Sequence, residues 1–157
     1  MKRRAFAATL AAAAVAACSG RLVAGSYQVS HTNAEWLRIL GPDRYGILRE
    51  SGTEPAFSSP LNGETRPGAY FCAGCDLALF SSKTKYDAGE GWPSFWDVLP
   101  GATQTHNDDS FGMDRTEVRC RRCGGHLGHV FDDGPPPTHL RYCIDGLALR
   151  FVAGTSA

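Results

Sequence analysis

Four of the six cysteines in this 157-residue chain form two matched C-x-x-C pairs, Cys72 with Cys75 and Cys120 with Cys123. Each C-x-x-C turn brings two sulfur atoms to one point, and two such turns provide the four thiolates that complete a tetrahedral zinc site. The spacing therefore predicts that these residues bind Zn2+. Disulfides or redox-active pairs are the alternative if the protein works in an oxidising compartment.

Cys143 lies outside these pairs, in the run Leu140-Arg-Tyr-Cys-Ile-Asp145. The run alternates as a β-strand does, which places Arg141, Cys143 and Asp145 on one face. A guanidinium group beside a thiol favours the thiolate, which is the nucleophilic form of cysteine. Cys143 is therefore the candidate nucleophile, with a small buried core residue as the alternative.

Two histidines and a group of aromatic residues could assist such a thiol. His126 and His129 follow the second cysteine pair, but four thiolates already fill one zinc site. Proton transfer or hydrogen bonding to a substrate is favoured over a second metal, and histidines bound to backbone groups are the alternative. Trp92 and Trp96, in a segment with neither helical nor strand period, could line an apolar pocket or belong to the core.

The elements that must position these residues are short strands behind a helical start. Thr32 and Glu35 form a capping box for a first helix, Gly41-Pro42 ends it, and a second short helix ends near Gly52. A chain of this length supports one domain. Short strand-like runs between turns predict a mainly β, antiparallel fold. The predicted strands are at residues 70–72, 77–80, 116–120, 129–131, 140–144 and 147–152.

The first 17 residues have a basic start and an alanine-rich apolar run, which is the layout of a signal peptide. Arg3-Arg4 resembles a twin-arginine export signal, and residues 15–18 resemble a lipobox in which Cys18 is lipidated. Ordinary cleavage near Ala17 is the alternative. The predicted boundaries are a signal peptide at 1–17, a tether at 18–30 and a folded domain at 31–157.

Charge and targeting limit the partners. The chain has 16 basic and 16 acidic residues, and loss of residues 1–17 would leave a net charge near −3. No basic surface is predicted that would attract nucleic acid. We therefore expect an exported protein of the periplasm or cell envelope, with no nucleic-acid partner and no membrane contact other than a lipid anchor at Cys18.

Several motifs, in order, resemble the B-type methionine sulfoxide reductases (MsrB). They are Cys72-Ala-Gly-Cys75, Gly91-Trp-Pro-Ser-Phe95, Arg115-Thr-Glu-Val-Arg-Cys120, His126-Leu-Gly-His-Val-Phe131, Asp133-Gly-Pro-Pro-Pro-Thr138 and Arg141-Tyr-Cys-Ile144. The resemblance runs from about Thr32 to Val152. It implies a β-tent-like fold of two antiparallel sheets, a structural zinc ion away from the catalytic residues, and reduction of the R epimer of free or protein-bound methionine sulfoxide.

The same resemblance implies a role for each candidate residue. The nucleophile attacks the sulfoxide and becomes a sulfenic acid, the tryptophan contacts the substrate methyl group, and the remaining residues position substrate, water and proton. The catalytic candidates are Cys143, His129, His126 and Arg141; the substrate-binding candidates are Trp92, Asp133 and Asp145; the metal ligands are Cys72, Cys75, Cys120 and Cys123.

Two positions depart from the family pattern. Glu90 occupies the place where many members have a resolving cysteine, and Asp145 occupies the place of the usual asparagine. The first departure predicts a one-cysteine enzyme, recycled by a thioredoxin-like or other external thiol reductant. Cys18 is the one other uncommitted thiol, and lipidation would block it. The second predicts that a carboxylate on the face of Cys143 opposes its ionisation.

Two rival interpretations stay open from the sequence. A zinc-containing binding module could use Trp92 and Trp96 as an aromatic cage, although Cys143 and both histidines would then have no shared purpose. A thiol-disulfide oxidoreductase could use the C-x-x-C pairs, although no thioredoxin-like βαβ pattern surrounds either pair.

Overall fold

The computed structural model describes residues 27–154. The predicted signal peptide, Cys18 and the first part of the predicted tether lie outside these residues. Within the described part of the chain, no helix combines the length and apolar character needed to cross a membrane.

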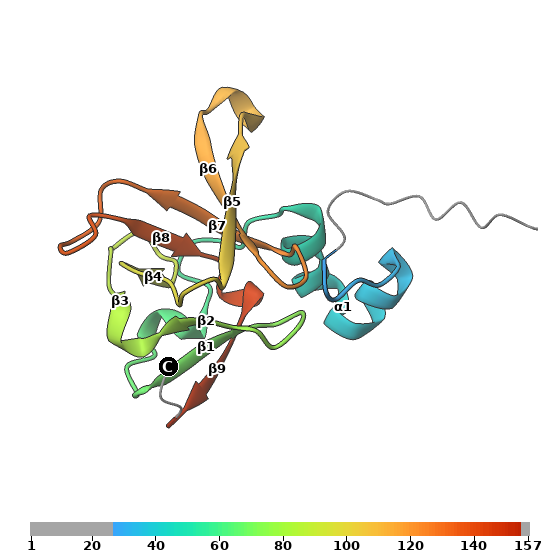
Figure 1. Cartoon of the computed structure of the whole chain (residues 1–157), viewed down its shortest axis with the longest axis horizontal. Helices are drawn as coiled ribbons and strands as arrows, with labels where there is room; N and C mark the ends of the chain where they lie inside the picture. The colour runs from blue at the N-terminus through green and yellow to red at the C-terminus, as the bar shows by residue number, and fades with distance from the viewer. Residues whose placement is uncertain (1–26, 155–157) are drawn as a thin grey trace, which may run out of the picture.

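Two antiparallel sheets make up the domain (Figure 1). One has the strand order β2-β1-β9, and the other has the order β3-β4-β8-β7-β6-β5. This arrangement confirms the expected mainly β fold of two antiparallel sheets. The strands are β1 (Gly68–Cys72), β2 (Ala78–Ser81), β3 (Lys85–Tyr86), β4 (Ser94–Phe95), β5 (Thr103–Asp108), β6 (Arg115–Cys120), β7 (His126–Phe131), β8 (Arg141–Ile144) and β9 (Leu149–Ala153).

Aromatic side chains fill the space between the sheets. Phe80 of β2 stacks on Phe95 of β4, with ring centroids 4.3 Å apart, and Tyr70 of β1 meets Phe95 edge-on. Tyr142 and Ile144 of β8 point into this core, whereas Arg141 and Cys143 are only half-buried. The alternation predicted for this strand is therefore confirmed, and it turns Cys143 away from the core.

Helix α1 (Asn33–Glu50) covers β7 and the 3-10 turn after β8. Thr32 caps it with Glu35, as predicted, and Trp36 is buried. Gly41 has φ 72° and ψ 168°, so the helix is broken at Gly41-Pro42 into the two short segments that the sequence predicts. Four 3-10 helices complete the fold: η1 (Pro60–Gly63), η2 (Ser82–Thr84), η3 (Ser110–Gly112) and η4 (Gly146–Ala148).

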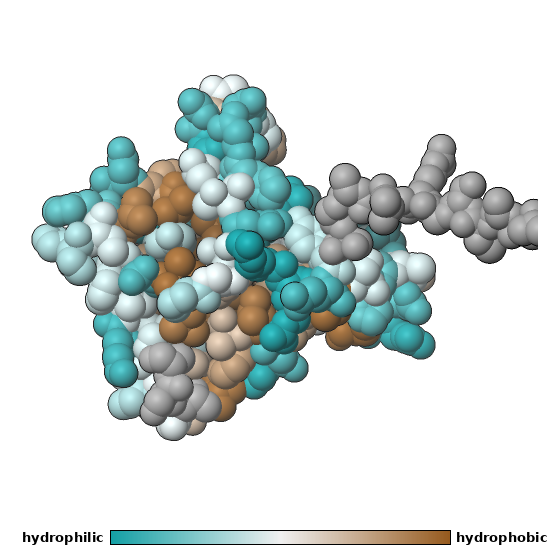
Figure 2. All heavy atoms as spheres, viewed as in Figure 1, coloured by the Kyte–Doolittle hydropathy of each residue, from teal (hydrophilic) through white to brown (hydrophobic). Residues whose placement is uncertain are grey.

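Strands β3, β4 and β5 were not predicted. Strand β5 has the sequence Thr-Gln-Thr-His-Asn-Asp, which lacks apolar alternation, because it is an edge strand with little of either face buried. It pairs with β6 along its whole length, and the hairpin projects from the domain with η3 at its tip (Figure 1). Its surface is largely hydrophilic, while hydrophobic residues gather over the body of the domain (Figure 2).

The described end of the predicted tether contacts the domain. The Val29 amide donates a hydrogen bond to the Arg122 carbonyl at 3.1 Å. The Gln104 side chain donates one to the Tyr27 hydroxyl at 2.7 Å. Tyr27 and Val29, at the described end of the predicted tether, are therefore hydrogen-bonded to the domain.

Candidate active site and metal centre

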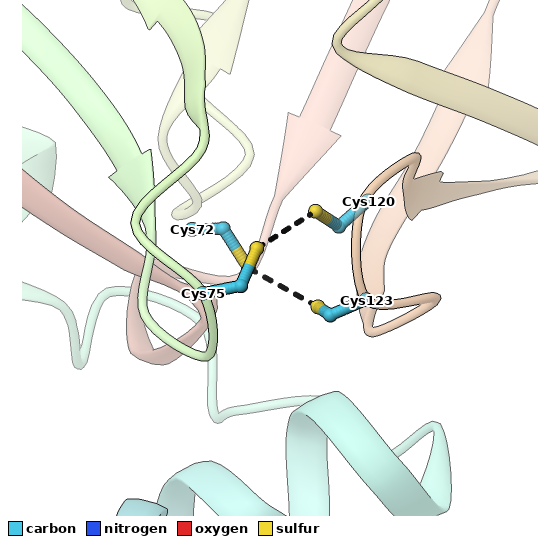
Figure 3. Close-up of side chains that lie close together, drawn as sticks. All are labelled: Cys72, Cys75, Cys120 and Cys123. Atoms are coloured by element: carbon cyan, nitrogen blue, oxygen red, sulfur yellow. Dashed lines mark hydrogen bonds between the residues drawn. The ribbon is translucent and has the colours of Figure 1, made fainter. Parts of the chain in front are cut away.

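The two C-x-x-C pairs come together at the junction of the two sheets (Figure 3). Cys72 ends β1 of the smaller sheet, and Cys120 ends β6 of the larger one. The Sγ atoms of Cys72 and Cys123 lie 3.7 Å apart, and those of Cys75 and Cys120 lie 3.5 Å apart. The cluster therefore links two sheets that are otherwise joined by apolar packing.

The sulfur spacing fits a metal and does not fit disulfides. A disulfide bond is about 2.05 Å long, whereas all four sulfurs here lie within 4.8 Å of one another and all four cysteines are free. Four thiolates about 2.3 Å from a tetrahedral zinc ion would lie about 3.8 Å from each other. The four residues can thus hold a metal ion, as the sequence predicts.

Cys143 lies on a row of paired residues across the larger sheet. It faces His129 of β7 on one side and Ser94 of β4 on the other, and His129 in turn pairs with Glu117 of β6. Gly128, with φ +146°, lets β7 approach this strand, because a Cβ atom there would lie 2.1 Å from the Cys143 carbonyl oxygen. The backbone therefore places an imidazole next to the thiol.

A cavity of about 140 Å³ opens beside the thiol. It brings together four of the predicted site residues: Cys143, His129, Trp92 and Asp145. The remaining lining residues are Thr53, Arg115, Gly128 and Phe131. A larger cavity of about 530 Å³ lies near η1, η4 and β9 and contains none of the predicted site residues.

Trp92 forms one wall of the smaller cavity. Its indole Nε1 donates a hydrogen bond to the Glu54 carbonyl at 3.0 Å. Gly91 before it has φ +93°, and a Cβ atom there would lie 2.7 Å from the Phe57 nitrogen. The sequence left two alternatives for this aromatic segment, a pocket lining or the core. Trp92 lines the cavity, whereas Phe95, three residues later, is fully buried in the core.

His129 is oriented by Asp108. The His129 Nε2 atom and the Asp108 Oδ2 atom are 2.7 Å apart, and Arg115 donates to the same carboxylate at 2.7 Å. Hydrogen bonds from Ser110 and then from His129 hold the pKa of Asp108 well below its usual range. Because the carboxylate accepts, the hydrogen on His129 lies on Nε2, and Nδ1 is left as the acceptor.

His126 lies behind the cavity, among buried carboxyl groups. Its Nδ1 is 2.6 Å from Glu117 Oε1, and its Nε2 is 3.8 Å from Asp145 Oδ2, with no hydrogen-bond partner among the described residues. Burial lowers the pKa of His126, although Glu117 opposes this. A neutral ring that donates from Nδ1 turns the lone pair of Nε2 toward Asp145.

Asp145 is buried, and its environment favours the protonated form. Burial raises its pKa to about 7, and the hydrogen bond that Oδ1 accepts from the Glu54 amide at 2.8 Å opposes the shift. A protonated Asp145 carries a hydrogen that could face His126 Nε2, as the amide of an asparagine would. The Glu54 carboxylate accepts from the Gly146 and Leu147 amides at 2.6 and 3.0 Å, which fixes the turn after Asp145.

The Cys143 thiol has its pKa raised to about 11, and burial is the main cause. Arg141 lowers the pKa, as the sequence predicts, while Asp145 and Glu90 raise it further. The effect of Arg141 on the Cys143 pKa therefore has the predicted direction, but burial outweighs it. At neutral pH the sulfur carries its proton.

Arg141 and Asp133 form a pair beside the cavity and are not among its lining residues. Two hydrogen bonds of 2.8 Å join the guanidinium to the carboxylate, and they lower the pKa of Asp133. The Arg141 guanidinium carbon lies 4.5 Å from the centre of the Phe131 ring, which does line the cavity. Through this stacking the pair supports one cavity wall.

Comparison with known proteins agrees with this arrangement. The model of the SelR domain matches residues 40–153. A relative from Agrobacterium fabrum, "Peptide methionine sulfoxide reductase MsrB", is 55% identical over 127 residues, which cover 80% of this chain and 94% of the relative. A relative of the same name from Leptospira interrogans is 50% identical over 80% of this chain and 97% of its own length. The chain belongs to the MsrB family.

A solved structure, the Mis18 "Yippee-like" domain, is 15% identical and superposes with a TM-score of 0.45 on 58% of this chain and 100% of that domain. That similarity is too low to bear on fold or function. Membership of the MsrB family rests on the sequence relatives, and the family resemblance seen in the motifs is confirmed.

Several residues around this MsrB site were not predicted. Asp108 was missed because its strand has no apolar pattern, and Thr53 and Glu54 belong to a stretch that carries no motif. Glu117 lies inside one of the recognised motifs, but its contact with His126 depends on the pairing of β6 with β7. The additional residues that line the cavity or hold its side chains are Thr53, Glu54, Asp108, Arg115, Glu117, Gly128 and Phe131.

Proposed function

We propose that this protein reduces the R epimer of methionine sulfoxide to methionine, with Cys143 as the nucleophile. One observation carries the proposal: the one described cysteine outside the metal cluster lines a small cavity together with His129 and an indole wall. The relatives that share half of its sequence are named peptide methionine sulfoxide reductases. An apolar wall such as Trp92 suits the substrate methyl group.

The proposed reaction needs no proton from outside the site. The Cys143 sulfur attacks the sulfoxide, a bond forms between that sulfur and the sulfoxide oxygen as the sulfur–oxygen bond of the substrate breaks, and Cys143 becomes a sulfenic acid with no bond left to the substrate. The sulfoxide gains two electrons and the cysteine loses two. The hydrogen of the thiol becomes the hydrogen of the sulfenic acid, and methionine leaves as a neutral thioether.

Proton movement must accompany the attack, because the Cys143 thiol has a pKa of about 11. His129, or a water that it holds, is placed to receive that proton and deliver it to the sulfoxide oxygen. Asp108 fixes which ring nitrogen can accept. When Asp145 is protonated, one negative charge fewer lies beside the sulfur during this proton transfer than when Asp145 is ionised.

Recycling is proposed to use an external thiol, such as a thioredoxin-like protein. Glu90 lies where many members of the family have a resolving cysteine, and four of the five described cysteines belong to the cluster. Two reductant thiols return the sulfenic acid to a thiol, forming a disulfide between them and one water. Recovery of a disulfide between Cys18 and Cys143 after sulfoxide treatment would refute this scheme.

Zn2+ is the proposed occupant of the cysteine cluster, where it would be structural. Four thiolates in two C-x-x-C turns are a donor set that zinc prefers. Bound there, the ion would cross-link the two sheets and lend its binding free energy to folding. The four ligands are Cys72, Cys75, Cys120 and Cys123.

The proposed location is the periplasm or cell envelope, and it rests on residues 1–18 alone. A signal peptide followed by a lipidated Cys18 would hold the domain at a membrane surface. Oxidised envelope proteins would then be the nearest substrates. Mass spectrometry of Cys18 in protein isolated from its native cells tests the anchor.

An epimer-resolved assay tests the proposed activity. The protein is mixed with the R and S epimers of N-acetyl-methionine sulfoxide and a small dithiol, and methionine formation is followed. We expect consumption of the R epimer alone, and none by Cys143→Ser. A binding module would show ligand binding without turnover in both forms, and that outcome would overturn the assignment.

A further inference from the structure

A second hollow shares Trp92 with the cavity of Cys143. It has a volume of about 250 Å³, and its apolar lining includes Phe57, Tyr86 and Pro93. Trp92 lines both this hollow and the cavity of Cys143. A molecule long enough to pass over the indole edge could therefore occupy both at once.

Phe57 is the unusual member of this lining, because 73% of its side chain is exposed. Its backbone is nevertheless fixed: φ is +64°, and its amide donates to the Gly91 carbonyl at 2.7 Å. A large aromatic side chain exposed to water at the rim of a hollow suits an apolar contact better than it suits the core. The same hydrogen bond ties Phe57 to the residue before Trp92.

Charges around the hollow give no preference for one sign. Lys85 and Asp87 both line it, and Lys85 Nζ already donates to the Asn62 carbonyl at 2.9 Å. An acidic or a basic ligand would meet one like charge and one opposite charge. Charge therefore does not select the occupant of the hollow, whereas the exposed aromatic surface of Phe57 can contribute to selecting it.

We propose that this hollow is a subsite for a polypeptide substrate, which receives an apolar side chain within two residues of the oxidised methionine. The inference rests on the proposed function and specifies its substrate class. In an extended chain, side chains two residues apart are about 6.6–6.8 Å apart, and neighbours diverge to opposite sides. One side chain would then enter the Cys143 cavity while another enters the hollow that shares Trp92 with it. Free methionine sulfoxide cannot fill both.

The test compares two ratios of kcat/KM. The substrates are N-acetyl-methionine (R)-sulfoxide amide and two peptides with the sulfoxide at the centre, one flanked by leucines and one by serines. Phe57→Ala removes the exposed ring and keeps the backbone amide. Phe111→Ala is the matched control, since Phe111 is 89% exposed at the tip of the β5–β6 hairpin, away from the hollow.

In the wild type we expect the leucine peptide to exceed the serine peptide. Phe57→Ala should lower the ratio of leucine-peptide to amide kcat/KM by about five- to tenfold, as loss of one aromatic contact would. Phe111→Ala should leave that ratio at its wild-type value. Equal ratios in all three proteins would overturn the subsite, whereas failure of the wild type on every substrate would overturn the proposed function instead.

A second copy of this chain is the competing occupant of the hollow. Sedimentation velocity of the wild type and Phe57→Ala decides between them. We expect the same concentration-independent sedimentation coefficient for both. A self-associating wild type that Phe57→Ala converts to monomer would contradict the peptide subsite.

Discussion

The described cysteines of this protein lie in two different surroundings. In the cluster, four thiols converge within 4.8 Å at the joint between two sheets, where they can bind one ion. In the cavity, a single thiol lies beside an imidazole and an indole, with no second sulfur to pair with among the described residues. Under the proposed function, the groups around a cysteine decide whether it binds a structural metal ion or acts as a nucleophile.

Substituting the cavity thiol should have the largest effect on catalysis. Cys143→Ser keeps the size of the side chain but supplies a hydroxyl that is a far weaker nucleophile. We expect sulfoxide reduction to fall by about 10³-fold or more. Zinc content and thermal midpoint should stay at wild-type values, since residue 143 touches no metal ligand. Loss of zinc in this variant would show that the cavity and the cysteine cluster do not act independently.

Substituting a cluster thiol should have the opposite profile. Cys123→Ser removes one of four ligands, and we expect zinc binding to be lost together with several kcal/mol of unfolding free energy. Metal analysis and urea denaturation measure both effects, with Cys143→Ser as the matched control. A Cys123→Ser protein that unfolds like the wild type would show that the cluster does not stabilise the fold.

Within the cavity, uncoupling His129 from its carboxylate should cost less than losing the sulfur. Asp108→Asn keeps the side-chain size but can present an N–H to His129 Nε2, which favours the wrong tautomer. We expect kcat for the sulfoxide to fall by about 10²-fold, with KM nearly unchanged. Asp109→Asn is the control one residue away. A raised KM with an unchanged kcat would contradict a role in proton transfer.

Asp145 predicts a pH dependence of stability. Its folded pKa of about 7 lies above the ordinary value of 3.8, so its favourable contribution is complete below about pH 4 and is lost as the pH rises through 7. Asp145→Asn keeps the acceptor for the Glu54 amide and has no charge to bury. The unfolding free energy of the variant, relative to that of the wild type, should therefore increase from pH 4 to pH 7, by at most about 4 kcal/mol. Urea titrations that give the same difference at both pH values would contradict this.

The smallest expected effect is on thiol reactivity. Asp145→Asn removes one of the charges that raise the Cys143 pKa, while burial, the largest cause, remains. Alkylation by iodoacetamide near pH 8 should speed up by roughly two- to fivefold. Glu90→Gln should act in the same direction and by less. An unchanged rate in both variants would show that burial, and not these two carboxylates, raises the Cys143 pKa.

How much the sequence predicts depends on whether the signal is local. Cysteine spacing gives the ligand set, and alternation in residues 140–145 gives the face of Cys143, because both follow from short-range backbone geometry. The burial that raises the Cys143 pKa involves β4 and β7, which pair with the strand of Cys143 from distant parts of the chain. The sequence therefore predicted the direction of the Arg141 effect but not that burial outweighs it. Asp108 and Glu54 reach the site through pairing and turns without pattern, which local reasoning does not detect.

The central claim is that Cys143 alone takes the oxygen from the substrate. The measurement is a single turnover: excess R-methionine sulfoxide is added without any reductant, methionine is counted, and dimedone adducts are mapped by mass spectrometry. We predict about one methionine per chain and one dimedone adduct, on Cys143. A second methionine per chain, an adduct on a cluster cysteine, or the absence of any adduct would contradict oxygen transfer to Cys143 alone.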